Sequence, residues 1–131
     1  MFGASDLQGF IVYEESTFII AFRGTHNPFD IVKYAENNKP VSYSNCRDCM
    51  IHSGFYTAWN QIRLEFLFAL QKMMSLYRSI ATVAFLGHGL GGIFATLAIP
   101  EIISFFPIKP LILYNTFGQP RLGNEKFSSY I

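Results

Sequence analysis

The 131-residue sequence predicts an α/β fold with a mostly parallel central sheet and flanking helices. Two segments, 81–86 and 111–116, are apolar runs without a charged residue, as in strands that are buried on both faces. Each is followed by a segment with helical character, and this alternation is typical of parallel sheets. Half of the residues are hydrophobic and 17% are aromatic, which excludes a disordered chain. The length fits one domain, residues 1–131.

The first half of the chain contains a hairpin, a polar segment and a helix. Two short runs of Phe, Ile, Val and Tyr, at 9–13 and 17–23, flank the polar residues 14–16 and predict a β-hairpin. Residues 26–48 are rich in turn-forming residues, which predicts a long loop with some helix. Apolar residues recur every three or four positions over 55–77 and predict an amphipathic helix of about six turns.

The second half is more apolar. Residues 81–86 predict a buried strand, and residues 90–99 predict a helix that Pro100 ends or kinks. Residues 111–116 predict a second buried strand, and 123–131 begin a further helix.

Composition and charge limit the classes of partner and the cellular settings expected for this chain. The net charge is +1 and the basic residues form no stripe, so we expect no nucleic-acid partner. No basic segment precedes an apolar run at the N-terminus, so no signal peptide is expected in this chain. Residues 79–100 carry no Asp, Glu, Lys or Arg and are long enough to cross a bilayer. Their glycine-rich centre favours a strand, a turn and a helix instead, because glycine weakens helix interiors.

That centre, Gly87-His88-Gly89-Leu90-Gly91-Gly92, fits two motifs. As G-x-G-x-x-G between a strand and a helix it satisfies a dinucleotide-binding turn. That motif needs an acidic residue near the end of the next strand, and none lies between Glu101 and Glu125. As G-x-S-x-G it fits the nucleophile elbow of hydrolases. Gly87 and Gly91 are then in place, but Gly89 occupies the position of the nucleophilic serine.

Four blocks in order make the sequence resemble the class 3 (fungal-type) lipase family of the α/β-hydrolase superfamily. The blocks are residues 20–25 (IAFRGT), 52–55 (HSGF) with Ala58-Trp59, 87–92 (GHGLGG) with 95–98 (ATLA), and 116–124 (TFGQPRLGN). The resemblance implies hydrolysis of acyl esters, mainly of glycerolipids, by a Ser–Asp–His triad without a metal or organic cofactor.

The resemblance also implies roles for individual positions. Thr25 and Leu90 would supply the backbone N–H groups of an oxyanion hole, and Gly87, His88 and Gly91 would form the elbow turn around Gly89. Residues 27–43 match the region of a lid or its hinge, although Asp30-Ile31 stands where the family has an Asp-Trp pair.

The triad itself is incomplete in this sequence. Gly89 replaces the nucleophile, and no Asp or His follows it. We therefore expect a truncated, catalytically inactive lipase-like domain that lacks the C-terminal part of the fold. Three alternatives stay open: a non-catalytic lipid- or acyl-binding module, a membrane-inserted fragment, and a gene fragment without function. A lipid or acyl ester is the expected partner, and exposed apolar surface would favour a membrane surface or self-association.

Cys46 and Cys49 form a C-x-x-C pair three residues before His52. One such pair with one histidine has too few ligands for zinc, and its context is not that of a redox motif. We expect a local disulfide, which would place the parent protein outside the cell or in another oxidising compartment. His52 and His88 are expected to be structural.

Overall fold

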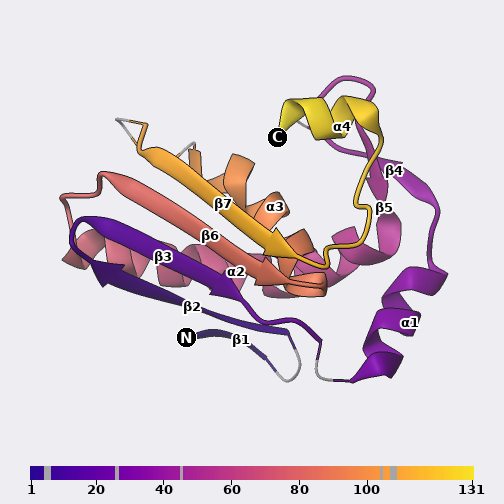
Figure 1. The fold of residues 1–131 in the computed structure, drawn as a ribbon, viewed down its shortest axis with the longest axis horizontal. Coiled ribbons are helices and arrows are strands. Elements are labelled where there is room, and N and C mark those ends of the chain that lie inside the picture. The colour runs from indigo at the N-terminus through magenta and orange to yellow at the C-terminus, as the bar shows by residue number, and fades with distance from the viewer. Residues whose placement is uncertain (5–6, 26, 45, 104, 107–108) are drawn as a thin grey trace.

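The computed structural model describes the whole chain except residues 5–6, 26, 45, 104 and 107–108. Within the described part, five strands form the main sheet in the order β1-β2-β3-β6-β7 (Figure 1). The pairs β1–β2 and β2–β3 are antiparallel, whereas β3–β6 and β6–β7 are parallel. The strands are β1 (Phe2–Ala4), β2 (Leu7–Glu14), β3 (Thr17–Phe22), β6 (Thr82–His88) and β7 (Leu111–Phe117).

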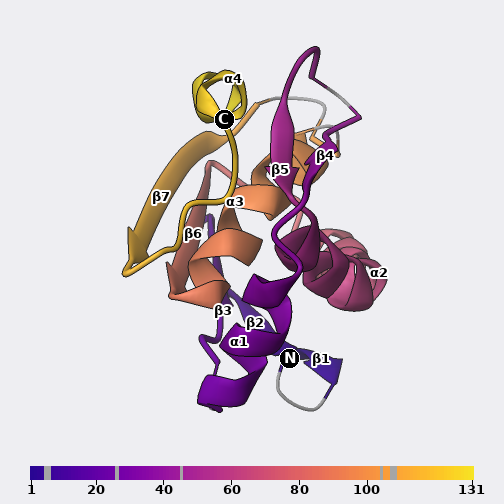
Figure 2. The ribbon, with the colours of Figure 1, turned by 90° about the vertical axis from the view of Figure 1, so that its right-hand side faces the viewer.

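Two helices lie on one face of this sheet, as Figure 2 shows. The long helix α2 (Ser53–Leu76) packs on β1 and β2, and α3 (Leu90–Ile103) packs on β3, β6 and β7. A second, two-stranded sheet of β4 (Pro40–Ser42) and β5 (Met50–His52) lies beside the short helix α4 (Glu125–Tyr130). Helix α1 (Pro28–Glu36) packs on α2. The mixed sheet with a parallel centre confirms the predicted α/β class.

Alternating side chains of the strands form the core with the two large helices. Phe18, Ile20 and Phe22 of β3 are buried, while the residues between them are only half-buried. The Phe22 ring lies 5.4 Å from the ring of Phe66 and 6.0 Å from that of Trp59, both on α2. Aromatic pairs of this kind stabilise a core beyond the area that they bury. Part of the high aromatic content therefore lies between the sheet and α2.

The predicted hairpin and long helix are confirmed, but three other expectations need correction. Pro100 does not end the helix that begins at Leu90: α3 continues to Ile103 with Pro100 inside it. Ile99 and Ile102 on either side are buried, so packing outweighs the hydrogen bond that proline removes.

The second correction concerns the strand predicted as buried over 111–116. It is β7, the edge strand of the described sheet, and most of its residues are exposed. Apolar composition indicates a strand but does not give its position in the sheet.

The third difference is that the structure contains three strands, β1, β4 and β5, that were not predicted from the sequence. Each has three residues, too few for a periodic pattern.

Residues 79–100, long enough to span a bilayer, are divided between β6 and α3. In the part of the chain that the structure describes, no helix combines the length and the apolar character that crossing a membrane requires.

Two phenylalanines of α2 give a matched test of this core. Phe66 is 0% exposed and Phe68 is 70% exposed. Phe66→Ala should lower the free energy of unfolding by about 3–5 kcal/mol, because it opens a cavity among aromatic rings. Phe68→Ala should change it by less than about 0.5 kcal/mol, as surface substitutions usually do. Urea unfolding followed by circular dichroism measures both, and equal effects would contradict this assignment of the core.

Candidate functional site

The turn between β6 and α3 consists of one residue, Gly89, because β6 ends at His88 and α3 begins at Leu90. Gly89 has a φ of 56°, in the left-handed region that favours glycine. Its N–H donates to the carbonyl of Phe117 at the end of β7 over 2.9 Å. The turn is thus sharp and held at its centre by the neighbouring strand, which is the geometry of an elbow.

The glycines of this turn differ in the space around them. A Cβ at Gly87 would overlap the Gly91 carbonyl oxygen, and a Cβ at Gly91 would overlap the Phe22 carbonyl oxygen. A Cβ at Gly89 would meet no atom within 4 Å. Gly87 and Gly91 are therefore required by the close approach of the backbone, whereas a side chain at Gly89 would project into open space.

The loop after β3 lies against this elbow. A Cβ at Gly24 would lie 2.8 Å from the His88 carbonyl oxygen, and one at Gly91 would lie 2.8 Å from the Arg23 carbonyl oxygen. Thr25 follows directly and is half-buried. Within the described residues, the backbone N–H groups of Thr25 and Leu90 have no hydrogen-bond partner. Two unused donors therefore lie on segments that pack together beside Gly89.

Both described histidines have structural surroundings. His88 lies between the loops after β3 and β7, since a Cβ at Gly118 would be 3.6 Å from its Nε2. His52 precedes α2, where its Nδ1 accepts a hydrogen bond from the Phe55 N–H over 3.4 Å. The imidazole ring of His52 also stacks on the ring of Phe55, with 4.1 Å between the two ring centroids. The structural hydrogen bond expected at His52 is therefore present.

A ring of hydrogen bonds links α3 to β7 and to the loop that follows it. Gln119 Nε2 donates to Thr96 Oγ1 over 3.0 Å, Thr96 Oγ1 and the Tyr114 hydroxyl lie 2.6 Å apart, and this hydroxyl donates to Gln119 Oε1 over 2.7 Å. Thr96 Oγ1 also donates to the Gly92 carbonyl of its own helix over 2.9 Å. Because Thr96 and Tyr114 each have a single hydroxyl proton, either of them can be the donor in the contact between their hydroxyls. The ring holds the loop after Gly118 against the start of α3.

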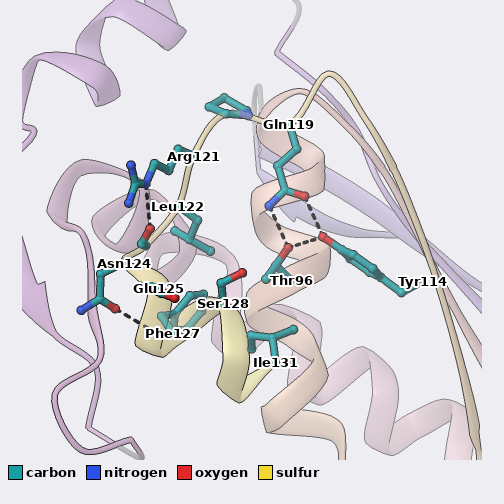
Figure 3. A pocket seen from close by; sticks show the side chains of 12 residues that line it. Thr96, Tyr114, Gln119, Arg121, Leu122, Asn124, Glu125, Phe127, Ser128 and Ile131 are labelled. Atoms are coloured by element: carbon teal, nitrogen blue, oxygen red, sulfur yellow. Dashed lines mark hydrogen bonds between the residues drawn. The ribbon is translucent and has the colours of Figure 1, made fainter.

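These three residues border a pocket of about 490 Å³ between α3, β7 and α4 (Figure 3). The pocket is lined by no residue of the elbow. Thr96 and Gln119 lie within the family blocks of the sequence, whereas Tyr114 lies outside them and was not predicted. The sequence of the apolar strand β7 does not indicate which residues the hydroxyl group of Tyr114 contacts.

Asn124 joins the β4–β5 hairpin to α4. Its Oδ1 accepts from the N–H groups of Met50 and Phe127, over 3.2 and 3.0 Å, and its Nδ2 donates to the Asp48 carbonyl over 2.9 Å. Cys46 and Cys49 form a disulfide at the tip of the same hairpin, which confirms the predicted pairing. Nearby, the His52 N–H donates to the Leu122 carbonyl over 2.8 Å, so residues of two separate family blocks meet beside this hairpin.

Helix α1 occupies the region expected to hold a lid. Asn27 Oδ1 caps it by accepting from the Phe29 N–H over 3.0 Å, and its other end is held where the Tyr34 hydroxyl donates to Gln61 over 3.3 Å. Phe29 is 79% exposed and Val32 is 51% exposed. Asp30 and Ile31 stand where the family has an Asp-Trp pair, and their side chains lie outside the described part of the structure.

Comparisons with known proteins agree on one family. The family model described as Lipase (class 3) matches residues 19–131. "Lipase A" of Sodiomyces alcalophilus is 31% identical over 134 aligned residues, which are 89% of this chain and 32% of that protein.

Solved structures share the fold. A fungal lipase–inhibitor complex described as a model for interfacial activation superposes with a TM-score of 0.82 at 29% identity, over 95% of this chain and 48% of that one. A triacylglycerol lipase with a serine protease triad gives a TM-score of 0.79 at 27% identity, over 95% and 48%. The chain spans about a third of the length of the curated relative and about half of each solved chain.

Alanine substitutions at two glycines of the turn test the geometry of the elbow. Gly91→Ala should destabilise the protein by about 3 kcal/mol, since its Cβ overlaps backbone that cannot move aside. Gly89→Ala should cost about 1 kcal/mol, for the left-handed conformation alone. Thermal unfolding of both variants gives the comparison, and a larger loss at Gly89 than at Gly91 would contradict the geometry.

Proposed function

This chain belongs to the class 3 lipase family, and we propose that it is a lipase-type domain that binds an acyl ester without transferring its acyl group. The observation that carries the proposal is the state of the elbow. The turn keeps the conformation and the close packing that present a nucleophile, while position 89 has no side chain.

The covalent step is absent for a chemical reason. Acyl transfer in this family needs an oxygen nucleophile that attacks the ester carbonyl and carries the acyl group until water releases it. Gly89 ends at Cα and has no such atom. No hydroxyl of another described residue takes its place on the turn, because the remaining turn residues are glycine, histidine and leucine. An acyl–enzyme intermediate therefore has no atom on which to form at this position.

The retained chemistry is the recognition of a carbonyl. The N–H groups of Thr25 and Leu90 lie on segments that pack together beside Gly89, and within the described residues neither is used by another group. Such paired donors stabilise the oxygen of a carbonyl, and they do so whether or not a nucleophile is present. The open space over Gly89, where a serine side chain would stand, leaves room for an ester group.

The substrate class comes from the relatives. One neighbour is described as a triacylglycerol lipase and the curated relative as a lipase, so a glycerolipid ester is the ligand that we propose. Helix α1, with Phe29 and Val32 exposed, is the element that we propose to contact a lipid surface. Apolar side chains of this kind on a short helix favour the boundary of a bilayer.

Hydrolysis of a short-chain ester tests the loss of the nucleophile. The purified 131-residue chain should release p-nitrophenol from p-nitrophenyl butyrate at the rate of buffer alone. Gly89→Ser should also stay at that rate, because no Asp or His follows position 89 in this sequence to orient and activate the serine as in the family's triad. A spectrophotometric assay measures both, with Gly89→Ala as the control for backbone strain. Turnover by the wild-type chain would overturn the proposal.

Ester binding tests the retained donors. Tributyrin should bind with measurable heat in titration calorimetry. Leu90→Pro removes the N–H at the first residue of α3, where proline is tolerated, and should weaken binding about tenfold. Leu90→Ala is the matched control: it loses the same side chain but keeps the N–H, so its affinity should stay near that of the wild type. Equal affinities of the two variants, both folded by circular dichroism, would argue against a carbonyl site at Leu90.

A further inference from the structure

Gln119 lies where the loop after β7 meets α3, and its carboxamide is held on both sides. Its Nε2 donates to Thr96 Oγ1 over 3.0 Å, and its Oε1 accepts from the Tyr114 hydroxyl over 2.7 Å (Figure 3). Thr96 is only 5% exposed, so one side of the carboxamide reaches the core. The preceding residue, Gly118, has a φ of 59° and gives the loop its turn after the strand. The side chain of Gln119 is therefore fixed by both of its polar atoms.

Gly92, in the first turn of α3, is the backbone on which this side chain packs. A Cβ at Gly92 would lie 3.1 Å from both the Cβ and the Oε1 of Gln119, and 3.2 Å from the Cβ of Thr116. The Gly92 carbonyl accepts from Thr96 Oγ1 over 2.9 Å, and its N–H donates to the Gly89 carbonyl over 3.0 Å. Gln119 thus holds Gly92 directly and through Thr96, and Gly92 in turn holds the Gly89 carbonyl.

The Gly89 carbonyl and the Leu90 N–H belong to one peptide group. Because this group is planar and trans, its C=O and N–H bonds point in opposite directions. A Gly89 carbonyl held by Gly92 therefore directs the Leu90 N–H outward from the start of α3. The N–H of Gly89 donates to the Phe117 carbonyl over 2.9 Å, so the end of β7 holds the other side of the same residue.

We propose that Gln119 is a positioning residue of the carbonyl site: it sets the direction of the Leu90 N–H by holding Gly92. This inference rests on the proposed function, in which that N–H binds the ester carbonyl. Hydrogen bonds weaken steeply when they are bent, so a donor is effective only if it is aligned before the ligand arrives. Glutamine suits this role because one planar group supplies both a donor and an acceptor.

Amide hydrogen exchange, followed by NMR without a ligand, tests the link between Gln119 and Gly92. Gln119→Met keeps an unbranched side chain of similar length and removes both hydrogen bonds. The Gly92 N–H should then exchange about tenfold faster, whereas the Phe66 N–H in the core helix α2 should exchange less than about threefold faster. Gln71→Met is the matched control, because it makes the same change on the exposed side of α2 and should leave both rates unaltered. Equal acceleration at Gly92 and Phe66 would mean general destabilisation and would overturn the proposal.

A double-mutant cycle tests the link between Gln119 and ester binding. Titration calorimetry with tributyrin should show that Gln119→Met weakens binding about fivefold in the wild-type background. In the Leu90→Pro background the same substitution should change Kd by less than about twofold, because the N–H through which Gln119 acts is already missing. A purely structural role would give the same loss in both backgrounds, and such additivity would also overturn the proposal.

Loss of the proposed function would give a different result from loss of this role. A wild-type chain that binds no tributyrin would contradict the carbonyl site itself, and with it any role of Gln119 in binding. Tributyrin binding that is unchanged by Gln119→Met, or Gly92 exchange that does not respond to it, would overturn the role of Gln119 and leave the carbonyl site in place. Circular dichroism establishes that every variant is folded.

Discussion

Backbone packed directly on backbone is the constraint on which the rest of this structure depends. Around Gly87 and Gly91 the end of β6, the start of α3 and the end of β3 approach so closely that no Cβ fits. This contact fixes where α3 leaves the sheet, and with it the layer of buried side chains beneath β3 and β6. It also determines that the loop after β3 lies beside Gly89. Core and candidate site therefore share one steric requirement.

Several parts of the fold are predictable because their physical signal is local. The β2–β3 hairpin alternates over strands of six to eight residues, and α2 repeats its apolar face over 24 residues. The position of β7 at the sheet edge was not predictable, since it depends on partners and not on composition. Pro100 shows the opposite limit: its strong local signal for a helix end is overridden where Ile99 and Ile102 are buried in the core.

The candidate site likewise contains features with a local sequence signal and features that depend on distant partners. The elbow and the disulfide could be predicted, because glycines at fixed spacing and a C-x-x-C pair act within a few residues. The hydrogen-bond ring of Thr96, Tyr114 and Gln119 joins three separate segments, and only the folded chain brings them together. Gly87 and Gly91, which support the turn, are fixed by steric contacts with the neighbouring backbone. Position 89, which would carry the nucleophile, has open space around it. Packing thus constrains the scaffold strictly and leaves the chemistry of position 89 free to change.

The contact made by Asn124 has a consequence for the order in which the chain folds. Its side chain binds the hairpin 74 and 76 residues earlier in the sequence. Closing such a loop costs chain entropy before any contact compensates for it, so long-range contacts of this kind slow folding. The disulfide spans only three positions and needs no distant partner. The hairpin tip can therefore be complete while the chain is still searching for its fold, and it offers α4 a finished surface on which to dock last.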